Sequence, residues 1–194
     1  MLNLKIISGG QTGVDRAGLD VALELGLPCG GWCPKGRLSE SGSIPSRYPL
    51  REMPSPKYPP RTEKNVRESD GTLILTWGPV TGGTALTVKL ARKRQKPFLV
   101  VDLSRRPDPQ DVRDWLRIHE IMTLNVAGPR ESKHPGIHKR AVSFLKDVII
   151  GIDQTFMIRD VQAPYGIQQI PFHSLEISKA IGGSEAGLPR SFVR

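Results

Sequence analysis

The sequence has few of the features that mark secreted or membrane proteins. Two cysteines among 194 residues cannot form a disulfide framework. No stretch approaches the roughly 20 consecutive apolar residues that a membrane-spanning helix needs. The first residues lack the basic region and the cleavage site of a secretion signal. These absences favour a cytoplasmic protein that does not associate with membranes.

Aromatic residues and acidic residues are also scarce. Only 6% of the residues are aromatic, so the core must be built mainly from Val, Ile, Leu and Ala. The 28 Lys and Arg outnumber the 19 Asp and Glu, and the whole surplus of +9 lies in residues 1–150. Such a surplus attracts nucleic acid, an acidic membrane surface or a small phosphorylated ligand, or it is simply a solvated basic surface. Nucleic acid is disfavoured because the chain has no dense basic helix with interleaved aromatic residues.

Short apolar runs alternate with helical patterns along residues 1–150. Five strands are predicted, at 2–8, 29–33, 72–77, 98–103 and 121–127. This alternation predicts an α/β fold with a three-layer, doubly wound (Rossmann-like), mainly parallel sheet. We expect the proline-rich stretch at 27–60 to be an ordered loop that covers a ligand. Residues 151–194 break the rhythm and are predicted to be a C-terminal extension, either an oligomer contact or a partly disordered tail.

Three glycine-containing segments each follow a predicted strand, and each offers polar groups to a ligand. Ligands of doubly wound sheets bind beyond the carboxyl ends of the strands, and N–H groups at a helix start point toward a bound anion. We therefore expect the three segments to clasp one anionic ligand, with three ordinary turns as the structural alternative. The residues proposed on this basis are Gly9, Gly10, Gln11, Thr12, Gly13 and Arg16, then Gly82, Gly83 and Thr84, and finally Asn125, Arg130 and Ser132.

Five sequence blocks carry a resemblance to a known family. They are SGGQTGVDR at 8–16, GGWCPKGR at 30–37, RTxxNVxxSDGT at 61–72, GGTxLT at 82–87 and NVAGPRES at 125–132. With these blocks, residues 3–148 resemble the molybdenum carrier family, a group of Rossmann-like, lysine-decarboxylase-like proteins. The resemblance implies a non-catalytic protein that binds, stores and protects molybdenum cofactor, a molybdopterin ending in a phosphate. It also implies a homo-oligomer and molybdoenzymes as acceptors of the cofactor.

The same resemblance adds further residues to the expected site. Lys35, Arg37 and Arg130 would neutralise the charge of the ligand. Arg61, Thr62 and Asn65 would line the cleft. A cationic, glycine-edged cleft suits a ligand that carries phosphate and oxo-metal charges.

The main alternative is a nucleotide-binding protein or a phosphoribohydrolase-like enzyme that acts on nucleoside monophosphates. Relatives with that activity carry PGGxGTxxE. When this motif is aligned on Pro79 and Thr84, Val80 and Thr81 replace two glycines, and Thr87 replaces the glutamate. A hydroxyl cannot replace a carboxylate in stabilising a developing oxocarbenium charge. No catalytic residue is therefore predicted.

A zinc site is a weaker alternative. Cys29, Cys33, His134 and His138 offer a set of four ligands, but Pro135-Gly136 lies between the two histidines and disfavours a shared helix face. No metal site is predicted.

Overall fold

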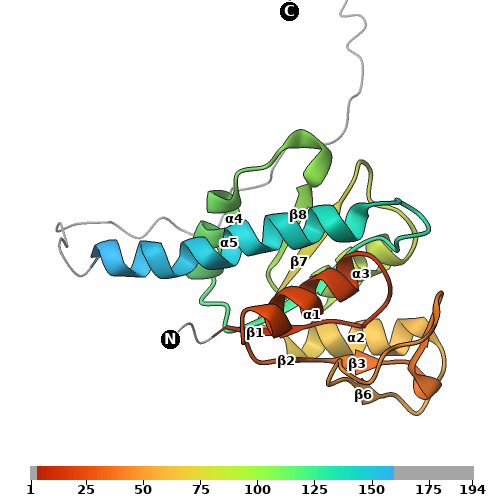
Figure 1. Ribbon diagram of the computed structural model, residues 1–194. Helices are drawn as coiled ribbons and strands as arrows, with labels where there is room; N and C mark the ends of the chain where they lie inside the picture. Colours follow the sequence, from red (N-terminus) through yellow and green to blue (C-terminus); the bar gives the residue numbers. More distant parts are fainter. Residues whose placement is uncertain (1–3, 160–194) are drawn as a thin grey trace, which may run out of the picture. The chain divides into compact units, whose positions relative to one another are not determined.

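A five-stranded parallel sheet forms the centre of the computed structural model, which describes residues 4–159 (Figure 1). The strand order is β2–β1–β9–β7–β8, and every neighbouring pair is parallel. The strands are β1 (Lys5–Ile7), β2 (Cys29–Gly30), β7 (Gly71–Thr76), β8 (Phe98–Asp102) and β9 (Thr123–Ala127). The predicted α/β, Rossmann-like fold is confirmed.

Helices cover both faces of this sheet and produce the three layers. They are α1 (Val14–Glu24), α2 (Tyr58–Glu68), α3 (Gly82–Lys93), α4 (Pro109–Ile118) and α5 (Ile137–Arg159). The helices α1, α4 and α5 pack together on one face, while α2 packs with α3 on the other. Local signals explain several ends: for example, the Asp108 carboxylate accepts a 2.8 Å hydrogen bond from the Gln110 N–H and so caps α4.

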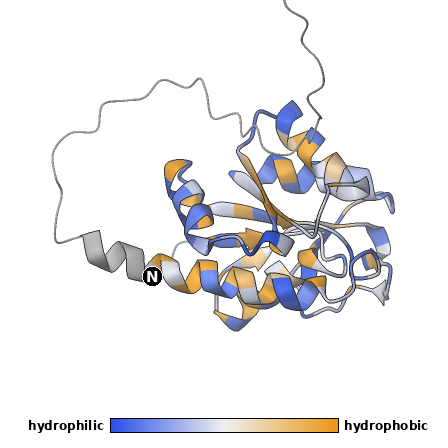
Figure 2. Cartoon of the chain, turned by 90° about the horizontal axis from the view of Figure 1, so that it is seen from above, coloured by the Kyte–Doolittle hydropathy of each residue, from blue (hydrophilic) through white to orange (hydrophobic). Residues whose placement is uncertain are grey.

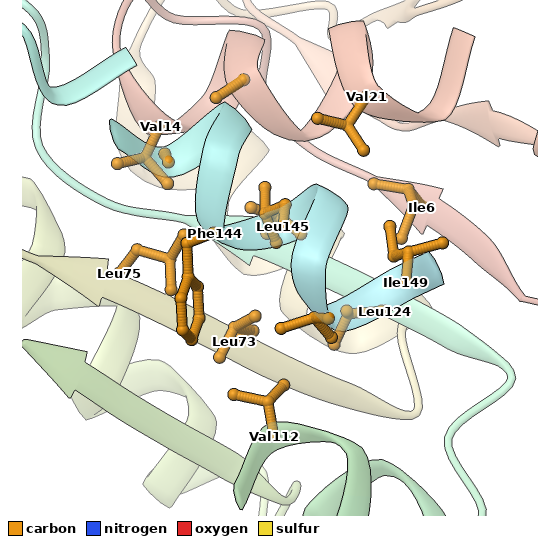
Figure 3. Packing of buried hydrophobic residues seen from close by; sticks show 14 of the residues in the cluster. Ile6, Val14, Val21, Leu73, Leu75, Val112, Leu124, Phe144, Leu145 and Ile149 are labelled. Atoms are coloured by element: carbon orange, nitrogen blue, oxygen red, sulfur yellow. The ribbon is translucent and has the colours of Figure 1, made fainter. Parts of the chain in front are cut away.

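The main core lies between the sheet and the layer of α1, α4 and α5 (Figure 3). Leu73 and Leu75 of the central strand β7 are completely buried there, as is Val14 of α1. All six residues of β7 are buried, which is typical of a parallel strand covered on both faces. The helices carry hydrophobic and hydrophilic bands in turn, as expected for helices with one face on a core (Figure 2).

The strand order reverses direction at β9. From β1 the chain crosses through α1 to β2, and from β7 it crosses through α3 to β8 on the opposite side. Because β9 lies between β1 and β7, the carboxyl ends of these three strands are neighbours. This reversal is where ligands of doubly wound sheets bind.

The proline-rich segment is ordered, as expected. The single strand predicted at 29–33 is divided at Gly31 into β2 and β3 (Trp32–Cys33), which belong to different sheets, and the later short elements of the segment were not predicted. In its small sheets β3 pairs with β6 (Arg51–Glu52), and β4 (Leu38–Ser39) pairs with β5 (Gly42–Ser43). The 3₁₀ turns η1 (Lys35–Arg37) and, elsewhere in the chain, η2 (Leu103–Arg105) complete the described elements. This segment has a core of its own, which is made by Leu19, Cys33, Ile44, Tyr48 and Leu50. In Figure 1, β3 and β6 lie beside α2.

The predicted division of the chain at residue 150 falls within a helix, because α5 continues to Arg159. Residues 160–194, most of the predicted C-terminal extension, lie outside the described residues, so the division stays a prediction. Among the described helices, none combines the length and the apolar character that a membrane span requires.

Candidate functional site

A cavity of about 410 Å³ lies at the carboxyl ends of β1, β9 and β7. Its walls come from the segments after these three strands and from α2, which supplies Tyr58, Arg61, Thr62 and Asn65. The volume is within the range of small-molecule sites, roughly 300–1,000 Å³.

The structure brings about half of the expected site residues to this cavity. The lining includes Gln11, Arg61, Thr62, Asn65, Gly82, Gly83, Thr84, Asn125 and Arg130. The remaining expected residues are not part of the lining. These are Gly9, Gly10, Thr12, Gly13, Arg16, Lys35, Arg37 and Ser132.

The first glycine turn, Gly9–Gly13, packs against the protein itself. A Cβ atom on Gly10 would lie 2.5 Å from the Leu50 side chain, and one on Gly13 would lie 2.4 Å from the Pro129 carbonyl oxygen. Both glycines have positive φ, 72° and 76°, which side chains disfavour. These glycines therefore allow a sharp turn and a close approach of neighbouring segments, and they do not face the cavity.

Two of the expected cations bind backbone carbonyl groups. The guanidinium of Arg37 donates to the carbonyl oxygens of Ile44, Pro45, Tyr48 and Leu50, at 2.9–3.2 Å. These bonds hold the 44–50 loop in place and leave the Arg37 charge away from the cavity.

The guanidinium of Arg16 donates to the Gly10 carbonyl oxygen at 3.2 Å and to the Ser39 hydroxyl at 2.9 Å. Lys35 is exposed on η1, outside the cavity lining. Sequence spacing placed Arg16 near the first glycine turn, and the family resemblance implied Lys35 and Arg37. Neither could show where the side chains point.

A buried ion pair forms the floor of the cavity. Arg61 Nη1 lies 2.9 Å from Asp15 Oδ2, and the two side chains are only 13% and 6% exposed. The Arg61 guanidinium covers Gly9, where a Cβ atom would collide with it. Burial raises the pKa of Asp15, and this rise is opposed by Arg61 and by hydrogen bonds from the backbone of Gln11 and Gly128.

At the start of α3, backbone N–H groups border the cavity and no side chain covers them. Thr81, the N-cap residue, makes no side-chain capping hydrogen bond, and a Cβ atom on Gly82 or Gly83 would have no neighbour within 4 Å. The first N–H groups of a helix have no acceptor within the helix, and the helix dipole makes this end positive. The second glycine turn therefore leaves open the helix start that the sequence analysis predicts to bind an anion.

Cations and aromatic rings surround this helix end. Besides Arg61, the cations of the lining are Arg130 and Lys133, and its one carboxylate, Asp15, is paired with Arg61. The Arg130 guanidinium lies over the Tyr58 ring, 4.9 Å from its centroid. Positive charge next to flat apolar surface suits an anion that also carries a ring.

The sequence analysis missed Tyr58, Trp77, Lys133 and His134 as lining residues. Trp77 directly follows the buried strand β7, and Lys133 and His134 follow the segment after β9. The positions of Trp77, Lys133 and His134 at or after the ends of predicted strands were a signal that could have identified them, whereas Tyr58 begins α2 and follows no predicted strand.

Two amide side chains differ in how they could serve a ligand. Asn65 Oδ1 accepts from the Trp32 N–H at 2.8 Å, and its Nδ2 donates to the Trp32 carbonyl oxygen at 3.0 Å. Both ends of Asn65 are therefore used to hold β3. Gln11 is 4% exposed, and its Nε2 has no partner, whereas its Oε1 accepts from the backbone N–H groups of Thr12 and Glu40. Gln11 thus has a free donor at the cavity wall.

The residues of the weak zinc hypothesis do not form a metal site. Within the part of the chain that the structure describes, no group of three or more His, Cys, Asp and Glu side chains could hold a metal ion. Cys33 is instead buried in the small core of the proline-rich segment.

Comparisons with known proteins give two matches. A model of the circularly permutated YpsA SLOG family matches residues 6–149. The crystal structure of a protein from Syntrophus aciditrophicus SB, named "putative molybdenum carrier protein", is 48% identical to this chain with a TM-score of 0.72. The match covers 75% of this chain and 94% of that one. No curated protein matches the chain.

Proposed function

Because the chain belongs to the circularly permutated YpsA SLOG family, we propose that its cavity binds molybdenum cofactor and that the protein stores and protects this cofactor without catalysis. The name of the 48% identical structure supports a role connected with molybdenum. We also propose that the protein is a homo-oligomer in the cytoplasm and that it delivers the cofactor to molybdoenzymes.

The open start of α3 is the observation that carries this proposal. The phosphate of the cofactor would accept hydrogen bonds from the N–H groups of Gly82 and Gly83, where the protein leaves space and no side chain caps the helix. Arg130 and Lys133 would balance the negative charge, and the pterin would lie against Tyr58 or Trp77. An anionic ligand with a fused ring uses both the polar and the apolar parts of the cavity.

The polar groups of the cavity support binding without chemistry. Thr87, which stands where the related hydrolases carry glutamate, donates its hydroxyl to the Gly83 carbonyl oxygen at 3.1 Å. Asp15 is held by Arg61 and is the one carboxylate of the lining. The α3 turn thus supplies no carboxylate that could stabilise an oxocarbenium ion.

Two matched variants at the start of α3 test the proposal. Gly83→Val would fill the open space at the helix end, whereas Ala85→Val places the same side chain at an exposed position of the same turn outside the cavity lining. We expect wild type and Ala85→Val to slow the decay of added molybdenum cofactor, and Gly83→Val to protect it at least about tenfold less. Decay is followed by the cofactor remaining that reconstitutes an apo-molybdoenzyme.

Arg130→Ala provides a second test, with Lys139→Ala as a control that removes a nearby exposed cation outside the lining. Arg130→Ala should weaken protection, while Lys139→Ala should leave it unchanged. Full protection of the cofactor by both Gly83→Val and Arg130→Ala would contradict the proposal that the cofactor binds in this cavity.

Asp15 favours a second candidate function, a phosphoribohydrolase acting on nucleoside monophosphates. A buried carboxylate at the wall of a cavity is placed as a general base or as a stabiliser of developing positive charge. Incubation with purine and pyrimidine nucleoside monophosphates distinguishes the two functions. Turnover with release of free base that is lost in Asp15→Asn would establish the enzyme and reject a carrier without catalysis.

A further inference from the structure

The carboxylate of Glu40 is bound in a small cradle beside the cavity. Glu40 lies at the tip of the hairpin formed by β4 and β5. Its carboxylate accepts hydrogen bonds from the Thr12 hydroxyl, the Ser132 hydroxyl and, at 3.2 Å, the Ser132 N–H. Thr12 follows β1 and Ser132 follows β9, so the cradle is built from the same strand ends as the cavity.

The cradle has the chemistry of an oxyanion site. The Thr12 oxygen accepts from the Glu131 N–H at 3.3 Å, which leaves its own hydrogen free to donate. Burial alone would raise the pKa of Glu40, but hydrogen bonds from Ser132 and Thr12 and the charge of Arg130 together lower it. The surroundings therefore favour a negative charge at this point.

The cradle and the cavity share residues. Arg130 lines the cavity and also attracts Glu40, and the Glu40 N–H donates to Gln11 Oε1 at 3.0 Å. The unpaired Nε2 of the same Gln11 side chain is buried at the cavity wall. A buried donor without a partner is rare in folded proteins, and this one lies where a ligand in the cavity can accept from it.

The Glu40 hairpin can leave without disturbing the main core. Its two strands have only two residues each, and none of the residues from Leu38 to Ser43 is buried. Besides Glu40, the Ser39 hydroxyl ties it to the body of the protein by accepting from Arg16. Moving the hairpin therefore breaks a few hydrogen bonds and displaces no buried side chain of its own.

We propose that Thr12, Ser132 and Arg130 form a second anion subsite for a tetrahedral oxyanion, and that Glu40 occupies this subsite until an anionic group of the ligand replaces it. The hairpin is then a latch that opens when the ligand arrives. This inference rests on the proposed function, because it adds a second anion-binding point beside the same cavity.

Calorimetric titration with inorganic phosphate tests the subsite without the cofactor. Glu40→Ala vacates the cradle, so we expect it to bind phosphate about tenfold or more tightly than wild type. Glu63→Ala is the matched control. It removes a partly buried carboxylate of α2 that pairs with Arg94, and it changes the net charge equally. This control should bind phosphate like wild type.

A second substitution identifies where the phosphate binds. Adding Thr12→Val and Ser132→Ala to Glu40→Ala removes two cradle donors and should abolish the gain. The proposal is overturned if Glu40→Ala binds phosphate no more tightly than wild type, or if the gain survives loss of both donors. Circular dichroism establishes that each variant is folded, and Glu40→Gln, which keeps the size of the side chain, should show part of the gain.

The outcomes separate this proposal from the carrier function. If Glu40→Ala gains phosphate affinity but no variant protects molybdenum cofactor, the subsite stands and the carrier proposal fails. If wild type protects the cofactor but Glu40→Ala gains no phosphate affinity, the carrier proposal stands and the subsite is rejected.

Discussion

The ion pair of Asp15 and Arg61 shows at the scale of residues how the site depends on its supporting charges. Both side chains are largely buried, and Arg61 also covers Gly9. A buried carboxylate is tolerated when a nearby cation balances its charge and backbone N–H groups donate hydrogen bonds to it. Removing the cation would leave that charge without compensation.

Arg61→Met should therefore lower stability in a way that depends on pH. At pH 8 we expect a loss of about 3 kcal/mol in the free energy of unfolding. Without Arg61 the pKa of Asp15 rises further in the folded variant. At low pH Asp15 is protonated and its burial costs little. As the pH rises through this pKa, the folded variant must bury an unpaired carboxylate and loses stability. The deficit relative to wild type should shrink between pH 8 and pH 5, as measured by urea denaturation.

Arg67→Met on the exposed side of the same helix is the control and should change stability little at either pH. An equal loss for Arg61→Met at pH 8 and pH 5 would mean that Asp15 does not carry the effect.

Residue roles were the least predictable part of the site. Arg37 and Arg130 both lie in segments that resemble the family, yet Arg37 binds the carbonyls of the 44–50 loop and Arg130 lines the cavity. A guanidinium can reach in any direction from its backbone position, so spacing alone cannot separate these two uses. Glu40 was missed for a related reason, because its partners Thr12 and Ser132 are distant in sequence.

The two glycine turns differ in purpose at the scale of structural elements. Both follow a strand and precede a helix, which is why the sequence analysis gave them the same role. Gly10 and Gly13 make close contacts with the chain, whereas Gly83 faces open space. Only the three-dimensional packing distinguishes a turn that holds the fold from a turn that is open to a ligand.

Alanine substitutions in the two glycine turns should differ in their effect on stability. Gly10→Ala imposes a positive φ on alanine and a collision with Leu50, so we expect it to lose about 2 kcal/mol or more of stability. Gly83→Ala meets no atom and has an ordinary φ, so its stability should change by less than about 1 kcal/mol. Thermal unfolding measures both, and equal losses would contradict the distinction.

The loop at 44–50 gives a further prediction at this scale. Arg37→Lys keeps the charge but loses the planar group that reaches four carbonyl oxygens. We expect faster hydrogen exchange at residues 44–50 and a stability loss of roughly 1–3 kcal/mol. Lys35→Arg, an exposed change on the same turn, is the control, and unchanged exchange in Arg37→Lys would show that the loop does not depend on this side chain.

Strands and helices of the main sheet were more predictable than the proline-rich segment. The apolar run of β7 is a local signal, and this strand forms at the predicted position to within one residue. The Asp108-Pro109 start of α4 is a local signal of the same kind. The strands β3 to β6 have two residues each and depend on long-range contacts, such as the bonds from Arg37. Such short elements have no periodic pattern from which they could be predicted.

At the scale of the whole molecule, sheet topology determines where the site lies. Alternating strands and helices predicted a doubly wound sheet, and the order β2–β1–β9–β7–β8 brings the ends of β1, β9 and β7 together. The basic surplus in residues 1–150 is consistent with the cations around the cavity. The sheet edge at which the cavity lies thus followed from the sequence, while its exact lining required the fold.

Native mass spectrometry of the protein purified from its own cells tests the central claim most directly. We expect wild type to carry the added mass of phosphorylated molybdopterin, with or without its molybdenum, and Ala85→Val to carry the same mass. Gly83→Val, which fills the space at the start of α3, should be free of it. A different bound ligand in wild type, or an equal amount of the cofactor on Gly83→Val, would contradict the account.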